Sequence, residues 1–189
     1  MTSFEFVFGL ISVITSLALT QMLSHCVALI RNFDRVRFSW RHACWAASAF
    51  MLLIGNWAAF WHVHNVQTWP MTDVLIRLTY VGILYAFCEL VMPEAGTEGP
   101  LDLREYHARE GHRYKLLLLV FTTVVILALV RSATGFVNWL EMAKFAILAE
   151  ANVLLALRAR SVRLDTATAV VQVALTLVYM MSTLKILSS

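Results

Sequence analysis

The chain has 189 residues, of which 60% are hydrophobic and 14% are charged, and its formal net charge is +3. A mean hydropathy of +0.71 lies outside the range of soluble globular domains, so the composition excludes a chain with a sizeable soluble domain. The basic residues lie in short segments between apolar runs, which favours membrane insertion over nucleic-acid binding.

The first apolar run has no charged residue between Glu5 and Arg31, and it predicts a retained first crossing over residues 4–30. Gln21 and His25 are four residues apart and lie in its second half. Small polar residues also recur at every fourth position, a spacing that lets helices pack closely in lipid. They are Ser12, Ser16, Thr20 and Ser24.

A second crossing is predicted over residues 43–63, after a segment with four arginines. Trp45 and Trp61 are separated by about 24 Å of helix, which places aromatic residues at both interfaces of one bilayer crossing. A third crossing is predicted over residues 73–92, where Asp73 and Arg77 can pair on one helical face. Glu89 lies about one turn inside its far end.

Residues 94–115 form the longest polar segment and are predicted as a loop. Gly96, Gly99 and Pro100 indicate a turn near its start. Apolar and basic residues then alternate at helical spacing, so we expect a short interfacial helix within this loop. Its exposed surface is a candidate docking site for a partner protein or for lipid headgroups.

The last three crossings are predicted over residues 116–130, 138–157 and 166–187. The fourth is uniformly apolar, and the fifth carries Lys144, Glu150 and Asn152. Asp165 is expected to cap the sixth helix. That helix has a polar face in an otherwise apolar sequence, formed by Thr168, Gln172, Thr176, Tyr179 and Thr183.

The sequence therefore predicts an all-α polytopic membrane protein, a single bundle of six transmembrane helices. Eleven of the fifteen Lys and Arg residues fall in the first, third and fifth connections, as four, four and three. The second connection has none. The positive-inside rule then places these three connections in the cytoplasm and both termini outside.

The segments VRFSWRHACWAASAFMLLIGNWAAFW and CELVMPEAGTEGPLDLREYHAREGHRYK resemble a group of uncharacterised small bacterial integral membrane proteins. The likeness covers about residues 4–117 and consists of a basic loop, a Trp-rich second helix, and a third helix that ends in Pro-Glu before a DLR segment. The resemblance implies a compact helical bundle in the bacterial inner membrane. It implies no activity, cofactor or site residue.

Polar residues within crossings are costly in lipid, so each is a candidate functional residue. Helix rise places one set in a common layer near the cytoplasmic side, where two carboxylates and a histidine can move protons or hold a cation if they converge. The alternative is a set of hydrogen-bonded packing contacts. This inner layer comprises Gln21, His25, Glu89, Glu150 and Gln172, next to Asn152, Thr176 and Tyr179.

A second set of polar residues lies within two turns of the helix ends on the other side. Local ion pairs explain this set, and a vestibule for a charged solute is the alternative. It comprises Glu5, His62, His64, Asp73, Arg77, Arg131, Glu141 and Lys144. No two histidines on different helices share a depth, so we expect no haem, and no metal site or other cofactor is predicted.

The sequence contains no motif of enzymatic catalysis, and two other functions are compatible with it. The first is an oligomeric channel or transporter for a small ion or proton, since six helices are few for a self-contained path. The second is a non-transporting sensor or assembly subunit that docks a partner through residues 94–115.

Overall fold

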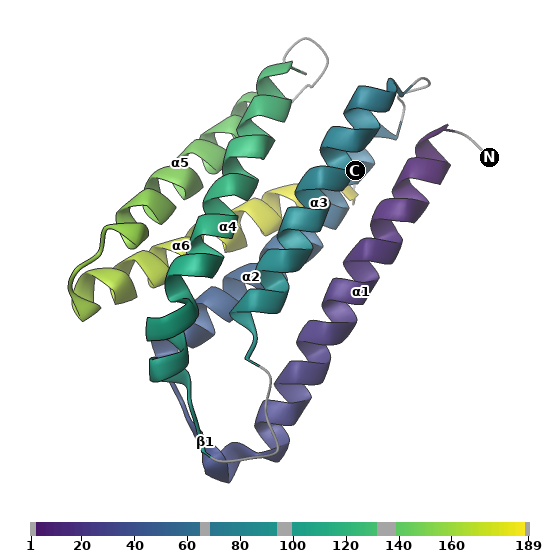
Figure 1. Ribbon diagram of the computed structural model, residues 1–189. Helices are drawn as coiled ribbons and strands as arrows, with labels where there is room; N and C mark the ends of the chain where they lie inside the picture. The colour runs from purple at the N-terminus through teal and green to yellow at the C-terminus, as the bar shows by residue number, and fades with distance from the viewer. Residues whose placement is uncertain (1–2, 65–68, 94–99, 132–138, 188–189) are drawn as a thin grey trace.

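The computed structural model of the chain describes residues 3–64, 69–93, 100–131 and 139–187. Six α-helices account for nearly all of them, which confirms the prediction of an all-α protein (Figure 1). The helices are α1 (Ser3–Arg31), α2 (Trp40–Ala59), α3 (Met71–Val91), α4 (Leu103–Arg131), α5 (Trp139–Leu157) and α6 (Val162–Leu187). Two short 3₁₀ turns, η1 (Phe33–Arg35) and η2 (Phe60–Val63), follow α1 and α2.

The prediction of a separate interfacial helix was wrong, because the segment forms the first part of the continuous helix α4. Leu103, His107, Tyr114 and Leu118 are all buried and lie four or seven residues apart. One buried stripe therefore runs through the whole first half of α4, and it packs the helix against the bundle. Asp102 caps α4, since its carboxylate accepts hydrogen bonds from the backbone N–H groups of the next turn.

The expected cap of the last helix was also wrong. The helix begins earlier than predicted, at Val162, and the Ser161 hydroxyl accepts a hydrogen bond from the Leu164 N–H. Asp165 lies one turn inside α6, so its carboxylate is available for contacts with other helices.

The segments that carry most of the arginines, including the first half of α4, lie toward one end of the bundle. Strand β1 (Val36–Arg37) follows η1, and it pairs in parallel with β2 (Leu101–Asp102), which precedes α4. The turn between α5 and α6 lies toward the same end (Figure 1). Helix α1 begins, and α6 ends, toward the opposite end.

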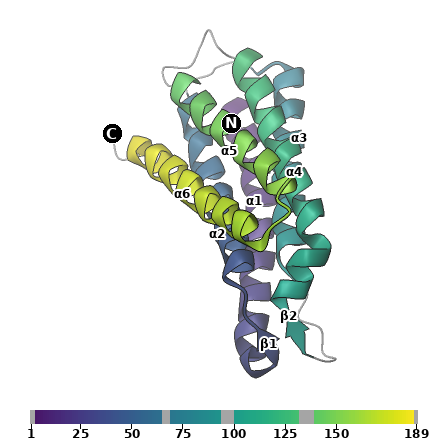
Figure 2. The same cartoon turned by 90° about the vertical axis from the view of Figure 1, so that its left-hand side faces the viewer.

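In the described part of the chain, four helices are long and apolar enough to cross a membrane: α1 from Phe4, α3, α4, and α6 as far as Leu184. Helices α2 and α5 are not among these four; α2 contains His42 and Asn56, and α5 contains Lys144 and Glu150. Both run alongside the apolar helices, and α6 crosses the bundle obliquely (Figure 2).

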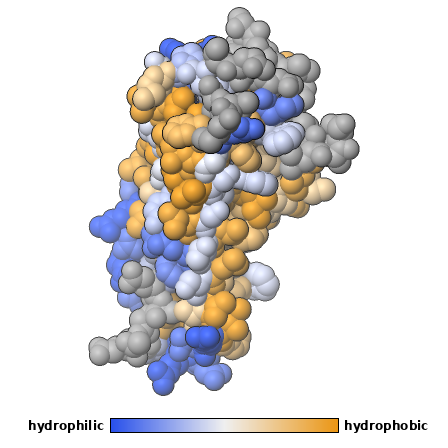
Figure 3. All heavy atoms as spheres, turned by 90° about the vertical axis from the view of Figure 1, so that its right-hand side faces the viewer, coloured by the Kyte–Doolittle hydropathy of each residue, from blue (hydrophilic) through white to orange (hydrophobic). Residues whose placement is uncertain are grey.

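The surface of the bundle is apolar over its middle. Phe6, Val13 and Leu17 on α1 are more than half exposed, as are Val170 and Val178 on α6. Figure 3 shows apolar residues over most of one face and hydrophilic residues gathered toward its ends. An apolar surface of this extent would aggregate in water, and contact with lipid explains it.

Helix α6 packs most extensively on α2. A β-carbon placed at Gly55 would lie 3.0 Å from the Tyr179 ring, so glycine at this position allows the two helices to approach closely. The polar face of α6 is thereby buried inside the bundle rather than exposed to lipid.

Candidate functional site

The most charged part of the protein interior surrounds Asp165. One of its carboxylate oxygens lies 2.8 Å from His107 Nε2 and 3.1 Å from an Arg41 guanidinium nitrogen, and the other lies 2.5 Å from Lys115 Nζ. The second ring nitrogen of His107 is hydrogen-bonded to the Tyr114 hydroxyl. We call these five residues, from α2, α4 and α6, the Asp165 cluster.

Burial makes the Asp165 cluster unusual. Tyr114 is fully buried, and the exposed fractions of His107, Lys115 and Asp165 are below a tenth. Lys115 also lies 5.5 Å over the ring of Trp45, which is itself fully buried. Two cationic side chains share one carboxylate, so the cluster carries an excess of positive charge when His107 is neutral.

His107 can transfer a proton between its two neighbours. If Nε2–H donates to Asp165, Nδ1 is the acceptor of the Tyr114 hydroxyl proton. An imidazole bonded at both nitrogens can accept a proton on one side and release it on the other.

A line of buried polar groups leads away from the cluster along α6. Asn152 Nδ2 donates to the Thr168 carbonyl at 3.0 Å and to Gln172 Oε1 at 2.9 Å. The Thr176 hydroxyl donates to the Gln172 carbonyl at 2.9 Å. Gln172 is fully buried, and its side-chain amide nitrogen has no hydrogen-bond partner among the described residues.

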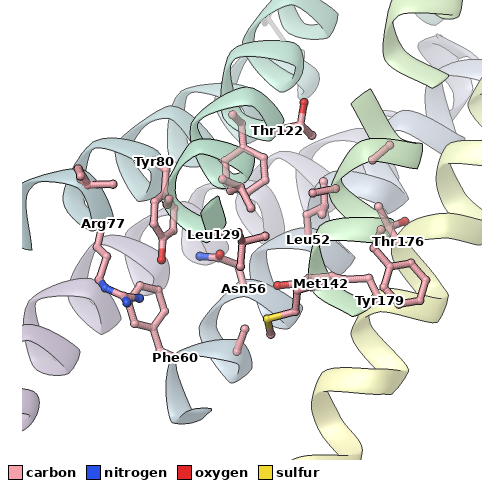
Figure 4. Close-up of a pocket in the computed structure, with 18 of the residues that line it drawn as sticks. Leu52, Asn56, Phe60, Arg77, Tyr80, Thr122, Leu129, Met142, Thr176 and Tyr179 are labelled. Carbon is pink, nitrogen blue, oxygen red and sulfur yellow. The ribbon is translucent and has the colours of Figure 1, made fainter. Parts of the chain in front are cut away.

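The line ends at a cavity of about 140 Å³ between helices α2 to α6. Thr176 and Tyr179 form one part of its wall, and Arg77 lies at the other side (Figure 4). We call it the Arg77 cavity. The same polar face of α6 thus reaches from the Asp165 cluster to the Arg77 cavity.

The predicted inner layer is divided into three separate groups. Asn152 and Gln172 meet between α5 and α6, whereas Glu150 accepts a hydrogen bond from the Thr123 hydroxyl of α4 at 2.9 Å. Gln21 and His25 lie on α1, each with one buried polar atom that has no partner in the described structure. No described hydrogen bond or ion pair joins these groups to one another or to Glu89.

The predicted outer residues are also dispersed. Asp73 lies 3.9 Å from Arg131, and no described ion pair joins it to Arg77, the partner that the sequence suggested. The exposed His64 ring stacks on Trp61, and Glu5 and Lys144 are both exposed on the surface. The side chains of His62 and Glu141 lie outside the described residues. Only Asp73, Arg77 and Arg131 of this set line the Arg77 cavity.

The Asp165 cluster was missed by sequence reasoning, although one signal for it was available. His107, Tyr114 and Lys115 are spaced seven and eight residues apart, so they lie on the buried stripe of α4. Ionisable residues on such a stripe require buried partners. Within the described residues, no group of three or more His, Cys, Asp or Glu side chains is placed to hold a metal ion.

His42 lies beside the cluster, just before the predicted second crossing. Its exposed fraction is 2%, its ring packs edge-on against Tyr106, and neither ring nitrogen has a described hydrogen-bond partner. Burial, with the nearby His107 adding to the effect, lowers the pKa of His42 to about 4. The folded protein therefore holds this ring in its neutral form.

The low pKa of His42 predicts a loss of stability in mild acid. An unfolded histidine has a pKa of about 6.5, so the stabilisation is complete above that pH and is lost as pH falls toward 4. Between pH 7 and pH 4 the free energy of unfolding should fall by about 3 kcal/mol more for the wild type than for His42→Leu. Denaturant titrations in detergent micelles measure the free energy of unfolding at each pH. An equal pH dependence for the wild type and His42→Leu would contradict a neutral, buried His42.

The chain matches no known family model, and it shows no significant similarity to any curated protein or solved structure, so the geometry alone carries the functional argument.

Proposed function

We propose that this protein is a membrane protein that conducts protons, with the buried polar face of α6 as the path. The observation that carries the proposal is the continuity of this face. It joins the Asp165 cluster to the Arg77 cavity through Thr168, Gln172 and Thr176, a distance of about 21 Å by helix rise from Asp165 to Tyr179. Hydroxyl and amide groups both donate and accept, so water or a proton on this path keeps hydrogen-bond partners.

The contacts of His107 favour a proton over a metal cation as the conducted species. Arg41 and Lys115 outnumber the single carboxylate, and their positive field repels a metal ion and also opposes a permanently protonated His107. His107 binds a proton covalently and is bonded at both ring nitrogens, which is the arrangement of a relay.

The topology is part of the same proposal. We infer six crossings in a bacterial inner membrane, with the arginine-rich connections in the cytoplasm and both termini outside. The position of the three arginine-bearing segments toward one end of the bundle supports this arrangement (Figure 1). The Asp165 cluster then lies toward the cytoplasm and the Arg77 cavity toward the outside.

We further propose that the protein forms a homo-oligomer through α1. The small polar ridge predicted for packing is largely exposed, since Ser16, Thr20 and Ser24 have no helix covering them in a single chain. In lipid, a helix surface of this kind favours close contact with another helix.

Proton flux into sealed vesicles tests the proposal. The purified protein is reconstituted around a trapped pH-sensitive dye, and a potassium gradient with valinomycin drives protons inward. Gln172→Leu should lower the flux about tenfold or more. An apolar side chain leaves a gap in the polar path, and this gap should raise the barrier to proton passage by roughly 1–3 kcal/mol. The substitution removes both the Gln172 acceptor of Asn152 and the partnerless amide nitrogen, and Asn152 keeps its hydrogen bond to the Thr168 carbonyl, so folding should tolerate it.

Glu150→Gln is the matched control, because Glu150 pairs with Thr123 away from the path, and its flux should equal that of the wild type. Equal flux in wild type and Gln172→Leu would contradict the proposed path.

A second candidate function is docking to anionic lipid headgroups or an acidic partner. Arg104, Arg109 and Arg113 are exposed on the first half of α4, at the end where β2 precedes it. Vesicles in which the wild type carries no flux would favour this function over conduction.

A further inference from the structure

The Arg77 cavity has the features of a binding site for a small organic molecule. Its volume of about 140 Å³ is close to that of cavities that hold a single six-membered ring. Most of its wall is apolar, and a few polar groups reach it from α2, α3 and α6 (Figure 4). Binding sites of small molecules commonly combine an apolar wall with a few converging polar groups.

Arg77 supplies a cation that forms no ion pair within the described residues. Its guanidinium lies 4.7 Å over the Trp69 ring and 5.5 Å over the Phe60 ring. No carboxylate of the described residues forms an ion pair with it, because Asp73, one turn away, lies beside Arg131. The aromatic faces and a hydrogen bond with the Tyr80 hydroxyl hold the guanidinium in place, and its other donors remain available for an anion.

Asn56 supplies a second, independent sign of a ligand. Its side chain is 94% buried, and Nδ2 has no hydrogen-bond partner among the described residues. Figure 4 shows Asn56 in the cavity wall between the side of Phe60 and Tyr80 and the side of Thr176 and Tyr179. A buried amide donor without a partner is costly, and an acceptor atom on a ligand would satisfy it.

We propose that the Arg77 cavity binds a small apolar monocarboxylate, with its ring or branched chain against the apolar wall. The planar guanidinium of Arg77 can hold a carboxylate through two parallel hydrogen bonds. Tyr80, whose hydroxyl points toward Arg77, and Asn56 supply further polar contacts near the bound group (Figure 4). The binding does not require proton conduction, although such a ligand would meet the path at Thr176.

Calorimetric titration of the full-length protein in detergent micelles tests this site, with benzoate as the probe. Benzoate should bind, and benzyl alcohol, which has the same ring without the charge, should bind about tenfold or more weakly. Arg77→Gln should weaken benzoate binding by a similar factor. Arg113→Gln is the matched control, since this arginine is 71% exposed on the first half of α4 and does not line the cavity, and its affinity for benzoate should equal that of the wild type.

Two further arms keep the result decisive. If Arg77→Gln does not fold, Arg77→Lys is the second variant, because lysine keeps the charge but lacks the planar guanidinium. Arg77→Lys should weaken benzoate binding several-fold, since one charge-assisted hydrogen bond is lost. No benzoate binding to the wild type, or equal affinity for benzoate and benzyl alcohol, would overturn the proposal. Displacement of benzoate by an equal concentration of short-chain phosphatidylglycerol would assign the site to lipid headgroups and would also overturn it.

Discussion

Asp165→Asn is expected to lower the free energy of unfolding in detergent micelles by about 3–5 kcal/mol. The substitution removes the only described carboxylate that contacts Lys115 and Arg41, whose side chains are 7% and 16% exposed. Two cations would then stay in a site of low dielectric with no counter-charge. Far-UV circular dichroism during denaturant titration measures the loss.

The control for this prediction is Asp102→Asn. Asp102 also pairs with an arginine, but Arg37 is 81% exposed and the two charged groups lie 3.7 Å apart. A surface pair of this kind contributes no more than about 1 kcal/mol, and asparagine still caps α4. Adding Lys115→Met to Asp165→Asn should restore part of the loss, because one orphaned cation is removed. A loss for Asp165→Asn no larger than that for Asp102→Asn would show that Asp165 does not neutralise the buried cations.

Two substitutions at Gly111 are expected to change stability in opposite directions. Gly111→Pro should cost about 3 kcal/mol or more, because proline removes the helical hydrogen bond to the carbonyl of residue 107 and its ring clashes with that turn. Gly111→Ala should raise stability by about 0.5–1 kcal/mol, since the added β-carbon lies 3.5 Å from the His107 ring, an ordinary contact.

Thermal unfolding of the two Gly111 variants, followed by circular dichroism, compares them directly. The two variants distinguish a continuous helix α4 from a short separate helix followed by a hinge. Proline at a hinge between two helices would be tolerated, so a Gly111→Pro protein as stable as the wild type would contradict the continuous helix.

The sequence predicted most helices because hydrophobic run length decides where helices form in so apolar a chain. Five predicted helices begin within four residues of their observed first residues. The failure at α4 has a physical reason. Its first half is charged on one face and buried on the other, and average hydropathy does not separate this pattern from that of a surface helix.

The site was harder to predict, because it depends on which helix faces meet. Arg41, Lys115 and Asp165 lie far apart in the sequence, and each is individually typical of a helix end. Estimates of depth placed Gln172 and Glu150 in one layer, but depth carries no information about direction around the helix. Asn152 and Glu150 are two residues apart on α5, and they contact different helices for that reason.

The buried face of α6 is the feature on which the account depends. Three buried polar residues, Thr168, Gln172 and Thr176, lie between the charged cluster at Asp165 and the cavity at Tyr179, whose Arg77 forms no described ion pair. If this face conducts, the two sites act at opposite ends of one path. If it does not, they are a structural network and an independent ligand site.

Proton conduction is tested most directly by comparing two sets of vesicles of the same lipid under the same potassium potential. One set contains the wild-type protein and the other is empty, and proton entry is measured in both. The account predicts acidification that rises with the amount of protein. Acidification no faster than in empty vesicles, for protein whose circular dichroism shows folded helices, would contradict it.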